Sequence, residues 1–394
     1  MVRVAGVGMT PFMKPGASPS YRDMGATAVR QALDDAALSY EDVQQAYVGY
    51  VYGDSTSGQA ALYEVGMSGI PIVNVNNNCS TGSTALFLAR QAVASGAVDC
   101  ALALGFDQMR TGALQEAFDD RPSPLSDFMG VADRKFAEEA SFVALPMAIK
   151  LFAGAGLEYQ RRYGAKDETF AKVTEKARRH AAQNERAIFR TPLTVEEILA
   201  STRFYGPITR LQCCPPTCGA AAALIVSEDF ARRRGLEAPI AIRAQAMTTD
   251  RPSTFAAGDM IQVVGADLTA SAARKVYEEA GIDPADIDVC ELHDCFTSNE
   301  IISYEGLGLT PEGSAERFIS DGDNTYGGRV VVNPSGGLLS KGHPLGATGL
   351  AQCAELVWQL RGSAGSRQVE GARLGLTHNI GLGGACVVSL FERV

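Results

Sequence analysis

Two stretches of the first half of this chain recur, in the same order, in its second half. Residues 38–48 align with residues 282–292 at an offset of 244, and residues 79–86 align with residues 343–350 at an offset of 264. The two offsets differ by 20 residues, as the insertion of one loop would produce. Because two matches in the same order are harder to obtain by chance than one, they predict two structurally similar halves.

The repeat also gives the expected organisation of the chain. We assign residues 1–238 to an N-terminal half and residues 239–394 to a C-terminal half. Residues 111–206 match nothing in the second half and are rich in glycine, proline and charged residues. A long connection of this kind is usually functional. We expect it to be an excursion from the first half that forms a lid or a region for binding a cofactor.

Hydrophobic periodicity predicts the fold class. Short apolar segments with strand character alternate with segments of helical period, which is the pattern of helices packed on mixed sheets. The expected strands are residues 2–8, 46–52, 70–76, 100–106, 220–227, 240–246, 288–293, 330–333, 374–379 and 385–391. The expected helices include residues 24–38, 83–94, 271–280 and 350–360. The prediction is an α/β protein.

Bulk properties exclude several classes of protein. The chain has 394 residues, of which 46% are hydrophobic and 20% are charged, as in folded proteins with a large core. Its formal net charge of −10 argues against a nucleic-acid partner and against a basic membrane surface. No segment approaches the roughly 18 apolar residues of a membrane span. The nine cysteines lack disulfide spacing and no targeting signal is recognised, so we expect a cytoplasmic location.

Cys79 is the first candidate for chemistry. It lies between an expected strand and an expected helix, so its thiol should lie at a helix N-terminus. The unpaired N–H groups and the helix dipole found there stabilise a thiolate and lower the pKa of a cysteine. The alternative is a small buried cysteine without a chemical role, which is common in apolar surroundings.

His343 occupies the position in the second half that Cys79 occupies in the first. If the halves pack around a pseudo-twofold axis, the two side chains would face each other across one cleft. His343 ends a glycine-rich connection at the start of a helical segment, where it would act as a base or as an oxyanion donor. A phosphate-binding loop competes with this interpretation, but the Walker spacing is absent and a proline follows the histidine. A structural role is the third interpretation.

His293 and Cys295 lie together at the end of the expected strand 288–293. Both side chains would reach a cleft if the chain twists there. Histidine and cysteine are also zinc ligands, but a zinc site needs two further ligands and the neighbouring sequence provides none. We therefore expect no metal ion in this protein.

Three other segments have two interpretations each. The glycines that follow His378, Gly381 among them, suit an oxyanion-binding nest of N–H groups and equally suit a tight turn. The cysteine-rich segment 213–218 favours a structural role over a reactive one, because an apolar strand follows it. The basic residues of segment 161–190 suit either the phosphates of a nucleotide-like cofactor or a solvated helix face.

A nucleophilic cysteine, a histidine base, a second cysteine and oxyanion donors fit acyl transfer through a thioester. The motifs that carry these groups resemble those of the thiolase superfamily, and in particular its sterol carrier protein x type. They are VNNNC at 75–79, GDST at 53–56, HDCF at 293–296, GHP at 342–344 and the run 333–349. The resemblance extends over essentially the whole chain and implies no lipid-transfer domain after the thiolase part.

The resemblance implies a fold and an assembly. The fold is the five-layered αβαβα thiolase fold, built from two similar halves with a loop domain inserted in the first. The assembly is a homodimer, or a tetramer formed from dimers. The reaction is that of an acetyl-CoA C-acyltransferase: cleavage of a 3-oxoacyl-CoA by coenzyme A, or the reverse Claisen condensation, in lipid metabolism such as fatty acid β-oxidation. Acyl-CoA and coenzyme A are then substrates, and no cofactor is permanently bound.

The resemblance also implies roles for single residues. Cys79 is the nucleophile that becomes acylated, and His343 activates it and donates to an oxyanion hole. Cys295 is the acid/base cysteine, which better-known thiolases carry instead in a C-terminal loop. His293 binds the thioester oxygen, and the Gly381 loop contributes a backbone N–H to the second oxyanion hole.

Three rival functions have distinct requirements. A β-ketoacyl synthase would prefer acyl carrier protein to coenzyme A. A retro-aldolase of the thiolase fold should not need Cys79. A non-catalytic carrier of acyl-CoA or sterol would bind its ligand without thiol-dependent turnover, and the presence of both Cys79 and Cys295 argues against it.

Overall fold

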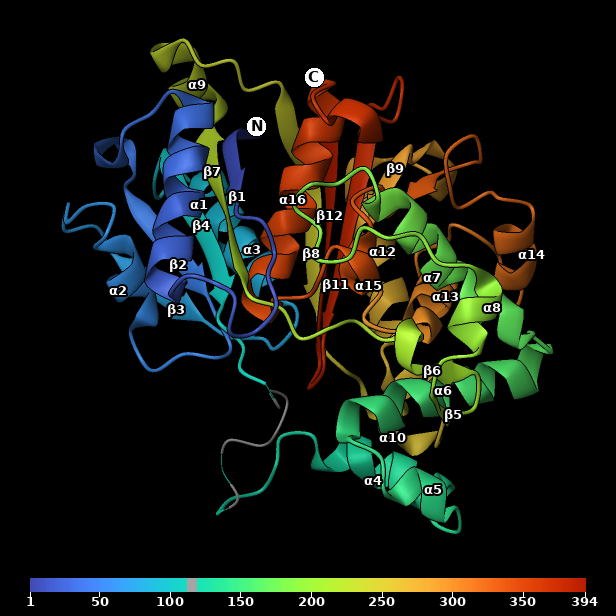
Figure 1. The fold of residues 1–394 in the computed structure, drawn as a ribbon. Coiled ribbons are helices and arrows are strands. Elements are labelled where there is room, and N and C mark those ends of the chain that lie inside the picture. The colour runs from blue at the N-terminus through green and yellow to red at the C-terminus, as the bar shows by residue number, and fades with distance from the viewer. Residues whose placement is uncertain (112–117, 119) are drawn as a thin grey trace.

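The computed structural model describes residues 1–394 except 112–117 and 119 (Figure 1). Ten strands form one sheet in the order β10-β9-β11-β12-β8-β1-β7-β4-β2-β3. The first half contributes β1 (Val2–Met9), β2 (Gln45–Gly49), β3 (Ile72–Val75), β4 (Cys100–Asp107) and β7 (Gly219–Ser227). The second half contributes β8 (Ile240–Thr248), β9 (Val289–Glu291), β10 (Val331–Val332), β11 (Leu374–Gly381) and β12 (Ala385–Arg393). All ten lie where the sequence predicts strands, with ends shifted by a few residues.

The two halves of the sheet repeat one topology. In the order β1-β7-β4-β2-β3, two antiparallel pairs are followed by two parallel pairs. The order β8-β12-β11-β9-β10 repeats the same succession. We call these two sets of strands the first wing and the second wing. A short antiparallel pairing between β1 and β8 joins them, through Arg3 with Ala241 and Val4 with Ile240.

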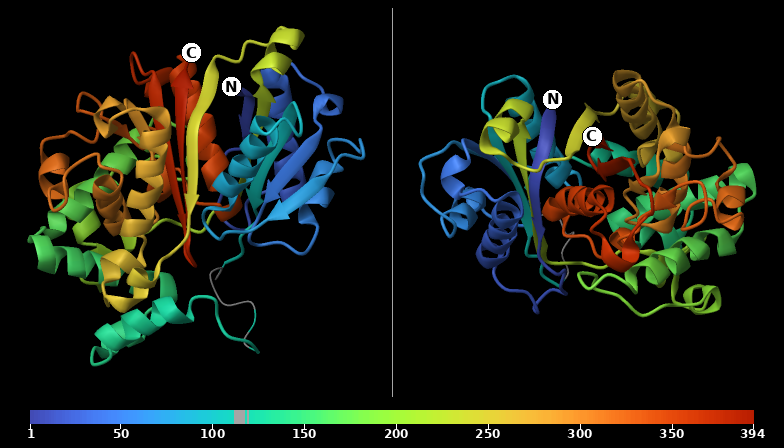
Figure 2. Two further views of the ribbon diagram at one scale, coloured as in Figure 1. Left: turned by 180° about the vertical axis from the view of Figure 1, so that it is seen from behind. Right: turned by 90° about the horizontal axis from the view of Figure 1, so that it is seen from above.

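Helices complete five layers (Figures 1 and 2). Helices α3 (Thr81–Ala94) and α16 (Leu345–Arg361) lie between the wings, while α1 (Tyr21–Ala36) covers the first wing and α12 (Ala266–Ala280) covers the second. The predicted five-layered α/β fold is therefore confirmed. The remaining helices of the two halves are α2 (Ser57–Leu62), α9 (Glu228–Arg234), α10 (Pro252–Ala256), α11 (Met260–Val263), α13 (Thr297–Gly306), α14 (Ala315–Ser320) and α15 (Gly337–Ser340). Among the described helices, none has both the length and the hydropathy that crossing a bilayer would need.

Glycines let the two central helices approach closely. A Cβ atom built on Gly349 of α16 would lie 2.3 Å from the backbone nitrogen of Ser83 in α3. One built on Gly82 would lie 2.5 Å from the carbonyl oxygen of Gly346. Both separations are too short for real atoms. The two helices therefore touch near their N-termini, which is where Cys79 and His343 precede them.

We expect Gly349→Ala to destabilise the protein by about 1–3 kcal/mol or more, because the added methyl group would force the central helices apart. Gly130→Ala is the matched control, since a Cβ there meets only the end of a flexible arginine side chain. The control substitution should leave stability unchanged or raise it by up to about 1 kcal/mol through the better helix propensity of alanine. Urea unfolding measures both. Equal stability of the two variants would contradict this view of the helix contact.

The segment between β4 and β7 belongs to the first half in sequence, but it packs on the second wing's side of the molecule (Figure 1). Its elements are α4 (Ser126–Lys135), α5 (Ala140–Val143), α6 (Met147–Tyr163), α7 (Asp167–Ala181), α8 (Val195–Leu199), β5 (Arg203–Tyr205) and β6 (Ile208–Thr209). The rings of Phe152 and Phe296 stack with centroids 4.8 Å apart, which ties α6 to the start of α13. Part of the predicted excursion, residues 112–117 and 119, lies outside the described residues.

Candidate active site

Cys79 lies in the turn between β3 and α3, two residues before the helix begins. The turn requires a positive φ of 51° at Asn78, a conformation that asparagine tolerates better than most residues. The backbone N–H of Asn77 donates to the hydroxyl of Thr81 at 2.8 Å, and the side chain of Asn78 donates to the carbonyl of Leu382 at 3.1 Å. The second contact ties the Cys79 turn to the loop that follows β11.

His343 occupies the equivalent turn before α16. Its backbone N–H donates to the hydroxyl of Thr217 at 3.1 Å. Its Nδ1 lies 2.7 Å from the hydroxyl of Thr348, and that hydroxyl donates its proton to the carbonyl of Pro344 at 2.9 Å. Because the Thr348 oxygen then accepts from the imidazole, Nδ1 carries the proton. Nε2 is left as the basic nitrogen, and it has no hydrogen-bond partner among the described residues.

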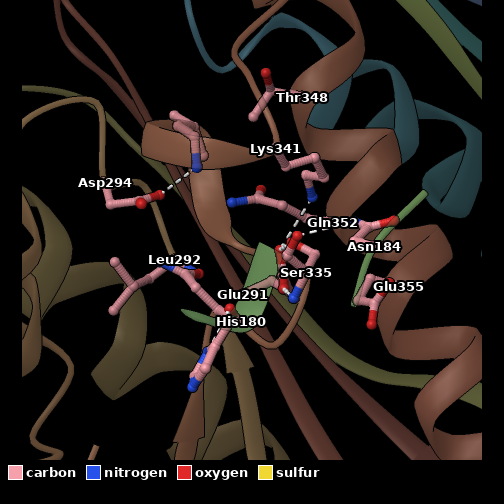
Figure 3. Close-up of polar contacts among 12 residues, drawn as sticks. His180, Asn184, Glu291, Leu292, Asp294, Ser335, Lys341, Thr348, Gln352 and Glu355 are labelled. Carbon is pink, nitrogen blue, oxygen red and sulfur yellow. Dashed lines mark hydrogen bonds and ion pairs between the residues drawn. The ribbon is translucent and has the colours of Figure 1, made fainter. Parts of the chain in front are cut away.

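His293 and Cys295 follow β9 in a buried turn that Asp294 anchors. The carboxylate of Asp294, which is labelled in Figure 3, accepts a hydrogen bond from a backbone N–H nearby. The donors are the N–H groups of Leu338 at 2.7 Å and Leu339 at 3.3 Å, both in α15. The backbone N–H of His293 points at Nδ1 of His378 in β11, 3.5 Å away. The anchoring by Asp294 fixes the turn relative to the segment that leads into His343.

A second buried carboxylate, three residues before Asp294, fixes the same segment. Glu291 at the end of β9 accepts the N–H of Ser335 at 3.0 Å and its hydroxyl at 2.7 Å. The ammonium group of Lys341 lies 3.2 Å from the same carboxylate (Figure 3). Both charged side chains are about fully buried, at 0% and 1% exposure, so breaking the pair would leave an unpaired charge in the interior. The chain that carries His343 is thus bound to β9 at several points.

These turns bring three candidate residues together. One donor atom each from Cys79, His293 and His343 lies within 4.8 Å of the other two. The two imidazole rings are 5.1 Å apart between centroids and almost perpendicular, at 88°. The juxtaposition of Cys79 and His343 across the pseudo-twofold repeat is therefore present in the structure.

Cys295 lies beside this cluster, together with Cys214 of the cysteine-rich segment 213–218. The backbone N–H of Cys214 donates to the carbonyl of Cys295 at 2.8 Å. The neighbouring residues Cys213 and Phe296 form an isolated antiparallel β-bridge. Burial raises the pKa of Cys295 well above its ordinary value, and the nearby thiols of Cys214 and Cys79 act in the same direction. Cys295 is therefore a neutral thiol that can donate a proton.

Segment 213–218 thus lies against the site, although its composition favoured a structural role. Cys218 fits that expectation, since it is fully buried and its thiol donates to the carbonyl of Met109 at 3.3 Å. Thr217 instead holds the backbone of His343. The sequence favoured a structural role for the segment that contains Cys214 and Thr217, and only the path of the folded chain brings them to the site.

The expected low pKa of Cys79 is wrong for the resting protein. Cys79 keeps part of its side chain accessible, but the surrounding protein raises its pKa to about 12, chiefly by burial and further by the charge of Asp107. Burial also lowers the pKa of His293 to about 3 and that of His343 well below its usual value. Desolvation outweighs the helix dipole here. The resting cluster therefore consists of a neutral thiol beside neutral imidazoles.

Gly381 is the last residue of β11 and packs on the Cys79 turn. A Cβ atom built on it would lie 2.0 Å from the carbonyl oxygen of Asn77 and 2.8 Å from the hydroxyl of Ser80. No side chain fits there. The backbone at the end of β11 is therefore in close contact with the turn that carries Cys79.

The basic segment 161–190 turns several of its charges inward. Lys176 is buried and pairs with Glu300, and Arg178 is buried with its guanidinium over the ring of Phe189, 4.3 Å from the centroid. These two residues form neither a solvated face nor an exposed phosphate site. The arginine at 179 is exposed and pairs with Glu175.

Comparison with known proteins defines the family. The family model described as "Thiolase, N-terminal domain" matches residues 2–229, and the one described as "Thiolase C-terminal domain-like" matches residues 250–391. This chain belongs to the thiolase family.

Individual relatives are similar over the whole chain. "Sterol carrier protein 2" of Homo sapiens is 52% identical over 395 residues, which cover 99% of this chain and 72% of that protein. "Acetyl-CoA acetyltransferase" of Methanothermobacter thermautotrophicus is 37% identical and covers 100% of this chain and 99% of its own.

Solved structures share the fold. An "Ltp2-ChsH2(DUF35) aldolase" superposes with a TM-score of 0.83 at 25% identity, covering 100% of this chain and 97% of that chain. The human mitochondrial 3-ketoacyl-CoA thiolase in complex with CoA superposes with a TM-score of 0.74, covering 100% of this chain and 98% of its own. At 18% identity, the second likeness concerns the fold alone.

Proposed function

We propose that this protein is an acyltransferase that cleaves a 3-oxoacyl-CoA with coenzyme A, or runs the reverse Claisen condensation, through an acyl group on Cys79. The observation that carries the proposal is the basic Nε2 of His343, which has no partner among the described residues and belongs to a residue that clusters with the Cys79 thiol. A base placed beside a thiol can generate the thiolate when the substrate binds. Membership of the thiolase family and the acetyltransferase relative support the same reaction.

The first half-reaction forms the acyl-enzyme. His343 takes the proton of Cys79 at Nε2, and the thiolate attacks the 3-keto carbon of the substrate. The resulting oxyanion accepts from the N–H of Cys79 and from the loop at Gly381, and such a donor typically stabilises the transition state by about 3–4 kcal/mol. When the bond between the α and β carbons breaks, His343 and His293 stabilise the enolate of the departing acyl-CoA. Cys295 then protonates its α carbon.

The second half-reaction returns every proton to its starting place. The thiolate of Cys295 removes the proton of incoming coenzyme A. The coenzyme A thiolate attacks the acyl group on Cys79, and Cys79 leaves as a thiolate that recovers its proton from His343. The reverse sequence is a condensation, because the same acid and base serve both directions.

Mass spectrometry after mixing with acetoacetyl-CoA tests the proposal. We expect an acetyl group on the peptide that contains Cys79 and its loss when coenzyme A is added. The same peptide from protein alkylated beforehand on Cys79 is the control and should remain unacetylated. Absence of the adduct together with absence of coenzyme A consumption would overturn the proposal.

A retro-aldolase is the second candidate, because the aldolase structure superposes with the higher TM-score. Retro-aldol cleavage releases an aldehyde or ketone and forms no thioester with the enzyme. Cleavage that proceeds without Cys79 would favour it. The dimeric assembly and the role in β-oxidation stay predictions from the resemblance. The cytoplasmic location stays a prediction from the cysteine pattern and the targeting analysis.

Thr348 is proposed as the positioning residue for His343. We expect Thr348→Val to lower kcat/KM by about 10- to 100-fold, because the nearly isosteric side chain leaves Nδ1 without its acceptor and frees the ring to change tautomer. Thr348→Ser restores the hydroxyl and should recover most of the activity. The pH profile of kcat should also shift in the valine variant and return in the serine variant. An unchanged profile in both would contradict the positioning role.

A further inference from the structure

The cluster of Cys79, His293 and His343 has the composition of a metal site. One donor atom from each residue lies within 4.8 Å of the others. Both histidines are nearly fully buried, at 1% and 4% exposure. Nδ1 of His293 and Nε2 of His343 each lack a partner within hydrogen-bond distance among the described residues, although the side chain of Asn379 lies close enough to the His293 imidazole to act on its pKa. Buried polar nitrogens without partners are rare, and these two lie on residues of the same cluster.

We propose that, without substrate, these three side chains bind one Zn²⁺ ion, and that the bound ion blocks the enzyme. One thiolate and two neutral imidazoles are ligands that Zn²⁺ prefers. Zinc–ligand bonds of about 2.0–2.3 Å place tetrahedral ligands roughly 3.3–3.6 Å apart. Donors that already lie within 4.8 Å reach this geometry through small side-chain movements. The thiol proton of Cys79 is released to solvent as the zinc–sulfur bond forms.

The surroundings of the cluster favour a stable site. His343 is already oriented by Thr348, as a metal-binding histidine usually is by a partner on its second nitrogen. Three protein ligands leave a fourth position for water, as in open zinc sites. No zinc motif surrounds His293 in the sequence, because the other ligands of this site come from residues 50 or more positions away along the chain.

Bound zinc and acyl transfer exclude each other. Zinc would occupy the sulfur of Cys79 and the Nε2 lone pair of His343, which are the two groups that the proposed function uses first. The inhibition therefore rests on the proposed function, whereas the binding does not. This difference keeps the failure of one distinguishable from the failure of the other.

The binding test uses Zn²⁺ alone and Co²⁺ alone with the reduced, full-length protein. Equilibrium dialysis against a competing chelator should give one tightly held Zn²⁺ per chain. Co²⁺ should produce a thiolate-to-cobalt charge-transfer band in the near ultraviolet. Both signals should disappear after alkylation of Cys79. Zn²⁺ should also abolish turnover, and EDTA should restore it.

Variants decide whether these three residues are the ligands. In Cys79→Ala the affinity for Zn²⁺ should fall by at least about 100-fold, more than changes in the outer shell of a metal site usually cause. Cys213→Ser is the matched control and should bind as the native chain does, since its thiol faces the carbonyl of Thr209. Unchanged zinc binding in Cys79→Ala, absence of the cobalt band, or loss of binding in Cys213→Ser would each overturn the proposal. If thiolysis is absent but the cobalt band is present, the metal site stands and the proposed function fails.

Discussion

Replacing Cys79 with alanine is expected to lower turnover of acetoacetyl-CoA by at least about 10⁴-fold and to abolish the acyl-enzyme. Removing the nucleophile of a covalent mechanism costs this much, because the remaining groups of the site cannot substitute for it. Here the neighbouring His343 would keep its basic Nε2 but would have no Cys79 thiol to deprotonate. Steady-state kinetics and mass spectrometry of the intact protein measure the two effects.

Cys213→Ser is the control for Cys79→Ala. Cys213 is the chain neighbour of Cys214, which lies against the site. The thiol of Cys213 faces the carbonyl of Thr209 instead, so activity should persist. The thermal unfolding temperature of Cys79→Ala should remain near that of the native protein. Carbon–carbon cleavage at the native rate in the alanine variant would refute the covalent mechanism and favour the aldolase alternative.

Cys295→Ala has the second largest expected effect, and it separates the two halves of the reaction. We expect Cys79 still to be acetylated by acetyl-CoA, because His343 can pass the proton that it takes from Cys79 to the departing coenzyme A thiolate. Cleavage of acetoacetyl-CoA should fall by about 10²–10⁴-fold, the usual contribution of a general acid. Exchange of the α protons of acetyl-CoA with deuterated solvent should stop for the same reason. Nuclear magnetic resonance follows the exchange directly.

The neighbouring thiol provides the comparison for Cys295. Cys214 pairs with Cys295 through the backbone, so Cys214→Ala tests whether any buried thiol at this place supplies the proton. If Cys295 is the acid, Cys214→Ala retains α-proton exchange. Exchange that survives in Cys295→Ala and stops in Cys214→Ala would reassign the acid to Cys214.

The predicted strands could be read from the chain because they depend on local patterns, whereas the five layers were implied by the resemblance to the thiolase superfamily. Strand segments such as 100–106 and 220–227 are apolar runs of the right length, and they form β4 and β7 almost as expected. The repeat that aligned Cys79 with His343 predicted equivalent turns, and both residues lie two positions before a central helix. The close glycine contact of these helices explains why the two turns end up adjacent.

Other features of the site could not be predicted, because they depend on groups that are distant in the sequence. The helix position of Cys79 pointed to a lowered pKa, whereas burial by several segments raises it to about 12. Lys176 belongs to a basic segment of the kind that is typical of a protein surface. In the folded chain it is buried and pairs with Glu300. Burial and pairing of this kind are properties of the whole packing.

By itself, the sequence determined the alternation of strands and helices, the duplication, and the turns that present Cys79, His293, Cys295 and His343. These follow from hydrophobic period, glycine placement and short motifs, which act over a few residues at a time. Only the tertiary structure decided how those turns meet. It placed Thr348 to hold the proton on Nδ1 of His343, left Nε2 without a partner among the residues that the structure describes, and kept the whole cluster neutral. The physical reason is that proton positions and pKa values depend on burial and on hydrogen-bond partners, which exist only once the two halves have packed together.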